Sequence, residues 1–107
     1  MEPSVYDLTY NDLNPRFLFC CNLLRTEPEM NYHCHDFIEF VLILKGKTTF
    51  RIDEKLYDVE EGSVILLNPG TYHQSLPAAG TSAREVYLAF SNVEFAGCTR
   101  GHFPLFK

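Results

Sequence analysis

Short apolar runs, each closed by turn-forming residues, recur along most of this chain and limit the folds open to it. The sequence predicts strands over residues 16–25, 37–44, 48–52, 56–59, 64–67, 72–76 and 84–90, separated by turn signals such as KGK, DEK, EEGS and NPG. No stretch between these turns sustains the periodicity of an amphipathic helix. Short strands at this spacing are typical of an antiparallel barrel or a double-sheet roll, so we expect an all-β fold.

Size and charge exclude several classes of function. A chain of 107 residues, 46% apolar and 14% aromatic, is large enough to bury a single core. Its net charge of −5 and the absence of any Lys/Arg run oppose DNA binding by this part of the chain. No run reaches the roughly 18 apolar residues of a membrane span, and the acidic N-terminus lacks the apolar core of a signal peptide. The four cysteines form no C-x-x-C pair, which favours a reducing cytoplasm.

The stretch NYHCHDFIEFVLILKG, residues 31–46, places two imidazoles and a carboxylate just before and within an apolar run. Residues two apart share one face of a strand, so His33, His35 and Glu39 fall on the same side if the strand continues through Asp36. Val41 continues that face. The sequence therefore predicts a polar patch on an otherwise apolar inner surface.

A second polar pair follows the NPG turn, where His73 and Ser75 share a face of a short strand. A pairing that brings this strand opposite the first histidines gathers three imidazoles and one carboxylate inside the barrel. The residues expected to line this pocket are His33, His35, Glu39, Val41, His73 and Ser75, and the candidate metal ligands among them are His33, His35, Glu39 and His73.

Three interpretations of this set stay open. Neutral imidazoles with one carboxylate are a normal ligand set for Zn, Fe, Mn or Ni and leave positions open for water or substrate. The same side chains can instead form a metal-free polar pocket, in which a buried glutamate is paired with an imidazole. They can also lie on the surface. We favour the metal-free pocket as the most ordinary of the three.

The spacing of these residues resembles the two motifs of the cupin family. The segment from His33 to Gly46 matches the first motif, H-x-H, three residues, E, six residues, G, and the segment from Gly62 to His73 resembles the second. The departures are Glu27 in place of a glycine, a turn proline one place late at Pro69, and Pro77 in place of an asparagine. The resemblance implies a cupin-like antiparallel double-sheet roll, or jelly-roll barrel, in which the four candidate ligands lie together.

The segment HCHDFIEFVLILKGKTTFRIDEKLYDVEEGSVILLNPGTYHQ also resembles the N-terminal sensor domain of AraC-type transcription regulators. That resemblance implies a domain that binds a small-molecule effector, such as a sugar or another small organic compound, and dimerises. DNA is then contacted only by a separate C-terminal helix-turn-helix domain, which this chain lacks along with the dimerisation helices. The expected organisation is an arm at residues 1–15, a sensor barrel at 16–95 and a truncated tail at 96–107. The alternative is a stand-alone, metal-dependent cupin enzyme of dioxygenase or isomerase type.

Overall fold

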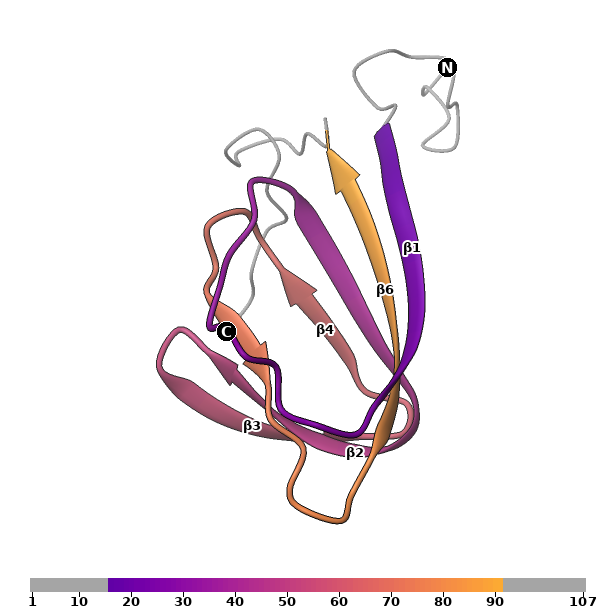
Figure 1. Ribbon diagram of the computed structural model, residues 1–107. Coiled ribbons are helices and arrows are strands. Elements are labelled where there is room, and N and C mark those ends of the chain that lie inside the picture. The colour runs from indigo at the N-terminus through magenta and orange to yellow at the C-terminus, as the bar shows by residue number, and fades with distance from the viewer. Residues whose placement is uncertain (1–15, 92–107) are drawn as a thin grey trace, which may run out of the picture.

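The computed structural model describes residues 16–91, and all the regular structure in this range is β-strand (Figure 1). The strands are β1 (Arg16–Arg25), β2 (Ile38–Ile52), β3 (Lys55–Glu60), β4 (Val64–Leu67), β5 (His73–Ser75) and β6 (Ala83–Ser91). Over these residues no helix is present that has the length and apolar sequence to cross a bilayer. The predicted arm at 1–15, the predicted tail at 96–107 and the last four residues of the predicted barrel lie outside the described residues.

The strands form two antiparallel sheets that share β2. The first sheet has the order β1-β6-β2-β4, and the second places β3 and β5 on either side of the C-terminal half of β2. Figure 1 shows β1 and β6 side by side on the right, and β3 of the second sheet at the lower left. The expected all-β, antiparallel, two-sheet fold is confirmed.

The predicted turn at KGK is wrong, because β2 runs without interruption through this tripeptide. Before Gly46 the strand pairs with β6 as far as the Gly46–Ala83 partners, and directly after it the strand pairs with β3, starting at Lys47 and Glu60. Gly46 has a φ of +77°, and the β2–β6 register shifts just before it, between Ile43 and Lys45. The glycine therefore bends one strand from the first sheet into the second instead of reversing the chain.

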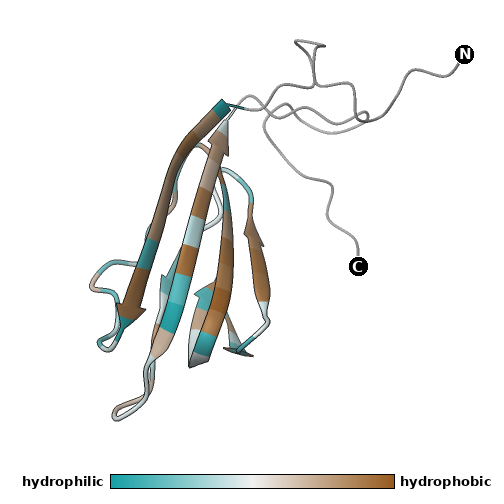
Figure 2. Ribbon diagram, turned by 90° about the vertical axis from the view of Figure 1, so that its right-hand side faces the viewer, coloured by the Kyte–Doolittle hydropathy of each residue, from teal (hydrophilic) through white to brown (hydrophobic). Residues whose placement is uncertain are grey.

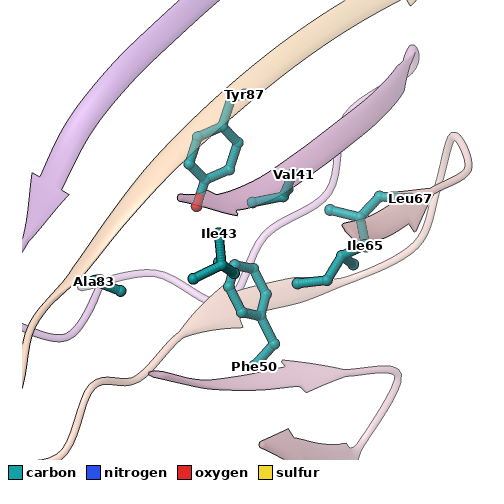
Figure 3. Close-up of a cluster of buried hydrophobic side chains, with 7 residues drawn as sticks. All are labelled: Val41, Ile43, Phe50, Ile65, Leu67, Ala83 and Tyr87. Atoms are coloured by element: carbon teal, nitrogen blue, oxygen red, sulfur yellow. The ribbon is translucent and has the colours of Figure 1, made fainter. Parts of the chain in front are cut away.

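The core lies between the two sheets and comes from alternate positions of the strands. Figure 3 shows its members, which are Val41, Ile43, Phe50, Ile65, Leu67, Ala83 and Tyr87. On β2 the odd-numbered residues from Glu39 to Ile43 are buried, while Phe40 and Leu42 are half-buried on the outer side. Figure 2 shows that apolar residues also lie along the first sheet in the view from its outer side. Strand alternation thus decides which polar side chains enter the interior.

Candidate functional site

Two backbone hydrogen bonds bring the first and third histidines together. His33 N–H donates to the His73 carbonyl at 3.1 Å, and His73 N–H donates to the His33 carbonyl at 2.8 Å, forming an isolated antiparallel bridge. The ring centroids are 4.5 Å apart. This pairing of His33 with the strand after the NPG turn is the arrangement that the sequence predicted.

The condition for one shared strand face, a strand that continues through Asp36, is not met, because β2 begins only at Ile38. The intervening residues bend, and the amide of Gly70 in the NPG turn donates to the His35 carbonyl at 2.8 Å. The His35 ring stacks on Phe37, with centroids 4.7 Å apart and an interplanar angle of 8°. Chain folding against the turn, and not one shared strand face, therefore places His35 beside the other two histidines.

Glu39, a buried residue at the start of β2, completes this site. Its Oε1 atom lies 3.4 Å from His73 Nε2 and 3.9 Å from His35 Nε2, and the residue is 4% exposed. We call His33, His35, Glu39 and His73 the His–Glu cluster. Neither Glu39 Oε1 nor His73 Nε2 has a hydrogen-bond partner among the described residues, although both atoms are fully buried. Two such atoms facing each other need either a proton or a cation between them.

Backbone carbonyls orient two of the imidazoles. His33 Nδ1 lies 2.9 Å from the Asn31 carbonyl oxygen, and His73 Nδ1 lies 3.0 Å from the Thr71 carbonyl oxygen. A carbonyl only accepts, so each Nδ1 carries the hydrogen that it donates. In the neutral ring this leaves Nε2 with its lone pair available, which is the tautomer that metal ligation through Nε2 requires.

The pKa values of two histidines move in opposite directions. Burial lowers the pKa of His73, but the adjacent Glu39 carboxylate, the Thr71 carbonyl and more distant Glu29 outweigh it, so the net shift is upward. For His35, burial is the largest influence, and together with the neighbouring histidines it lowers the pKa despite Glu39. Of these two rings, His73 is therefore the one that takes up a proton more readily beside Glu39.

The cluster fits a divalent metal ion. One ligating nitrogen from each of His33, His35 and His73 lies within 4.8 Å of the other two, and the Glu39 carboxylate adjoins two of them. The unpartnered Glu39 Oε1 and His73 Nε2 are the atoms that an ion would satisfy. Three imidazoles and one carboxylate suit Zn, Fe, Mn or Ni.

The two remaining predicted pocket residues lie elsewhere in the interior. Val41 is 0% exposed and belongs to the apolar core, where it packs among residues such as Ile43 and Tyr87. Ser75 is also fully buried and joins a second polar group around Glu85. The structure thus brings four of the six predicted residues into one cluster and distributes the other two over neighbouring parts of the barrel.

This second group, which the sequence analysis missed, surrounds a carboxylate that is 0% exposed. Glu85 Oε1 accepts from Tyr87 Oη at 2.7 Å and from Arg25 Nε at 3.2 Å, and Glu85 Oε2 accepts from Ser75 Oγ at 2.7 Å. Ser75 Oγ is also 3.0 Å from Thr48 Oγ1. We call these five residues the Glu85 network. A signal was present in AREVYLAF, because Glu85 lies two residues from both Ala83 and Tyr87 and therefore faces inward with them.

Comparisons with known proteins agree with this fold. Residues 19–105 match the family model described as AraC-like ligand binding domain. Over 59 residues, 55% of the chain, the sequence is 39% identical to an uncharacterized HTH-type transcriptional regulator, YdeC, from Bacillus subtilis (strain 168). The chain spans about one fifth of the length of this curated relative, since the match covers 20% of it.

Solved structures resemble the fold at low sequence identity. The polyketide cyclase RemF from Streptomyces resistomycificus superposes with a TM-score of 0.64 at 15% identity, over 70% of this chain and 55% of its own. A predicted oxalate decarboxylase from Thermotoga maritima superposes with a TM-score of 0.63 at 17% identity, over 69% of this chain and 66% of its own. A cupin protein from Bacteroides fragilis superposes with a TM-score of 0.57 at 21% identity, over 78% of this chain and 69% of its own. At these identities the likeness shows a shared cupin-like fold.

Proposed function

Because the chain belongs to the family of AraC-like ligand binding domains, we propose that it is the effector-sensing part of a transcription regulator. The small-molecule effector binds in the barrel, and a separate C-terminal helix-turn-helix domain binds DNA as part of a homodimer. The HTH-type regulator that shares 39% identity supports this assignment. The proposal places the protein in the cytoplasm, which agrees with the free thiols of Cys20, Cys21 and Cys34.

One observation carries the proposal, namely that the barrel interior holds a polar site with unfilled bonding capacity. Glu39 Oε1 and His73 Nε2 are buried without hydrogen-bond partners among the described residues. A purely structural polar pair is normally satisfied within the fold, because an unpaired buried acceptor costs about 1–3 kcal/mol. An effector, or a metal ion that helps to hold it, satisfies both atoms.

The position of the His–Glu cluster also indicates how a bound ligand can change the conformation of the domain. The His–Glu cluster joins three parts of the chain, since His33 and His35 precede β2, Glu39 is the second residue of β2 and His73 is the first residue of β5. A ligand that contacts all three favours the arrangement in which they stay together. Differential affinity for that arrangement shifts the population between two forms of the domain, which is the requirement for an effector.

The test compares ligand binding with folding in Glu39→Gln. Gln keeps the size of the side chain but removes the charge, so we expect effector or metal affinity to fall by about tenfold or more, while the melting temperature at pH 8.5, where a proton on His73 no longer contributes, changes little. The matched control is the exposed carboxylate variant Glu60→Gln, which should change neither quantity. If Glu39→Gln lowers the melting temperature substantially along with the affinity, Glu39 is a structural residue and the proposal for this site is refuted.

A metal-dependent cupin enzyme is the second candidate function, and the four ligands of the His–Glu cluster favour it. A metal held there would supply Lewis-acid chemistry, polarising a bound oxygen-containing ligand or activating water. His33, His35 and His73 would hold the ion through nitrogen, and Glu39 would balance its charge. The names of two similar structures, a polyketide cyclase and a predicted oxalate decarboxylase, suggest enzyme activity.

Elemental analysis of the purified chain, followed by an assay for turnover, separates the two candidates. One equivalent of a transition metal that survives dialysis, together with its loss in His73→Ala and in His33→Ala, establishes a metal centre. Turnover of an organic acid by the loaded protein would then favour the enzyme. A metal-free chain that still binds an organic ligand favours the sensor.

A further inference from the structure

The two-residue turn that joins β2 to β3 has a strained backbone. Asp53 and Glu54 have φ values of +46° and +71°, and they are the only non-glycine residues with positive φ in the part of the chain that the structure describes. Turns of this kind favour Asn-Gly or Asp-Gly, because a side chain crowds the left-handed conformation. Glutamate at the second position is therefore unfavourable by itself, and strain of this kind persists where surrounding contacts hold it.

The first amide of this turn bonds to the segment that carries His73. Asp53 N–H donates to the Tyr72 carbonyl at 3.0 Å, and Ile52 is the partner of His73 in the antiparallel pairing of β2 with β5. His73 is also the first residue of β5 and is buried. Ordinary sheet pairing therefore fixes the position of this histidine.

His33 lacks such support, because it lies outside the strands and its ladder contact is the isolated bridge to His73. The residue before it supplies a second attachment. Tyr32 Oη accepts from Glu54 N–H at 2.9 Å, across 22 residues of the chain. The strained turn is thus bonded to the residue that precedes each of these two histidines.

The Tyr32 ring is held from a second side by Arg51. The guanidinium carbon of Arg51 lies 4.0 Å from the ring centroid, and Arg51 Nη2 donates to Glu54 Oε2 at 2.9 Å. The ring of Tyr72 lies 5.5 Å from that of Tyr32. Glycine at position 54 would supply the same backbone amide without strain, but it could not hold Arg51 over the ring. The side chain of Glu54 therefore has a use that offsets its unfavourable backbone conformation.

We infer that Tyr32 is a positioning residue, which the Asp53–Glu54 turn anchors so that His33 is held at ligating distance from the rest of the His–Glu cluster. The inference rests on the proposed function, because it concerns how the same site binds its ligand. Tyr32 acts through the backbone of its neighbour. Since coupling between two sites is reciprocal, a ligand that fixes His33 also fixes the turn, and the turn responds to occupancy of the cluster.

Amide hydrogen exchange in metal-free protein tests the positioning. Tyr32→Phe removes the hydroxyl and keeps the ring, so it isolates the bond to the turn. We expect exchange at the His33 amide, measured by NMR, to become about three- to tenfold faster, because one hydrogen bond no longer opposes local opening. Amides in the β2–β6 pairing report global unfolding and should change less. Unchanged exchange at His33 overturns the inference.

Calorimetric titration of the 107-residue chain with Zn²⁺ tests whether this positioning matters for binding. Tyr32→Phe should weaken Zn²⁺ binding by about three- to tenfold, and Tyr32→Ala, which also removes the ring beside Arg51, by about 10- to 100-fold. Tyr57→Phe, at a residue of β3 that is 46% exposed, is the control and should bind as the parent does. Faster exchange at His33 with unchanged Zn²⁺ affinity in Tyr32→Phe would make Tyr32 a merely structural residue and overturn the inference.

Exchange at the Glu54 amide tests the reciprocal effect, which a merely structural contact would not produce. In the parent and in Tyr57→Phe, saturating Zn²⁺ should slow this exchange by about three- to tenfold, whereas in Tyr32→Phe it should have little effect. Equal responses in all three proteins overturn the inference.

Failure of the inference differs from failure of the site. If the parent and the Tyr32 variants bind Zn²⁺ equally, the inference is wrong and the site stands. A parent chain that binds no Zn²⁺ also overturns the inference, but by removing the metal from the site. Binding of an organic effector then remains the test of the sensor.

Discussion

Gly46→Ala should destabilise the domain far more than an ordinary glycine substitution. Gly46 has a φ of +77°, a conformation that costs an L-residue about 1–2 kcal/mol. Unlike the other glycines with positive φ, it also lies against a neighbouring segment. A Cβ there would overlap the carbonyl oxygen of Ser82 and lie 3.1 Å from its carbonyl carbon and 3.2 Å from Ala83 Cα. These are backbone atoms, so no side-chain rotation relieves the overlap.

The magnitude follows from what has to move. Ser82 must retreat, although its carbonyl accepts from Lys47 N–H at 3.2 Å and helps to hold the bend of β2 against the start of β6. Losing that hydrogen bond costs about 1 kcal/mol, and the accompanying backbone shift costs about 1–3 kcal/mol. With the conformational term, the free energy of unfolding should fall by about 3–6 kcal/mol. A typical domain has only about 5–15 kcal/mol in total.

Gly62→Ala is the matched control for this prediction. Gly62 has a φ of +90°, and a Cβ built there meets nothing within 4 Å, so it carries the conformational cost alone, about 1–2 kcal/mol. Urea unfolding followed by circular dichroism measures both variants. If the free energy of unfolding of Gly46→Ala is within about 1 kcal/mol of that of Gly62→Ala, the contact with Ser82 does not constrain the bend, and this account of β2 is refuted.

Three further predictions concern the interior. Phe50→Ala removes a ring that is 0% exposed and should lower the free energy of unfolding by about 3–5 kcal/mol in the same urea experiment. The control Leu56→Ala, at a residue that is 67% exposed, should change this free energy by less than about 0.5 kcal/mol. Glu85→Leu leaves the half-buried Arg25 guanidinium and the Tyr87 and Ser75 hydroxyls without their shared acceptor and should cost about 1–3 kcal/mol; a loss below about 0.5 kcal/mol would show that the Glu85 network adds no net stability. In chelator-treated protein, the proton on His73 should stabilise the fold, because the pKa of His73 is higher in the folded state than in the unfolded state, where it is about 6.5. This stabilisation should be complete below the unfolded-state pKa and should be lost as the pH rises through the folded-state pKa. The difference in melting temperature between the parent and Glu39→Gln should therefore be larger at pH 5.5 than at pH 8.5, and a difference that is constant with pH would contradict the assignment of the proton to His73.

The places where the sequence predictions failed have a common physical origin. KGK predicts a reversal because lysine and glycine favour exposed turns, yet β2 continues because it finds strand partners on both sides of Gly46. Glu85 escaped notice because its neighbours in sequence mark an ordinary alternating strand, while the residues that bond to it come from distant strands. Arg25 is 60 residues away from it in the chain.

Local sequence by itself determined where most strands lie and which residues face inward. Turn residues act on their immediate neighbours, and side chains alternate across a strand whatever that strand pairs with, so β1, β3 and β4 were predicted almost to the residue. The motif spacing also identified all four members of the His–Glu cluster. Only the tertiary structure decided how those members meet, because His35 reaches the cluster through a bend held by Gly70. It also decided that Arg25, Ser75 and Glu85 form one network, since which strands become neighbours depends on how the whole chain closes its core.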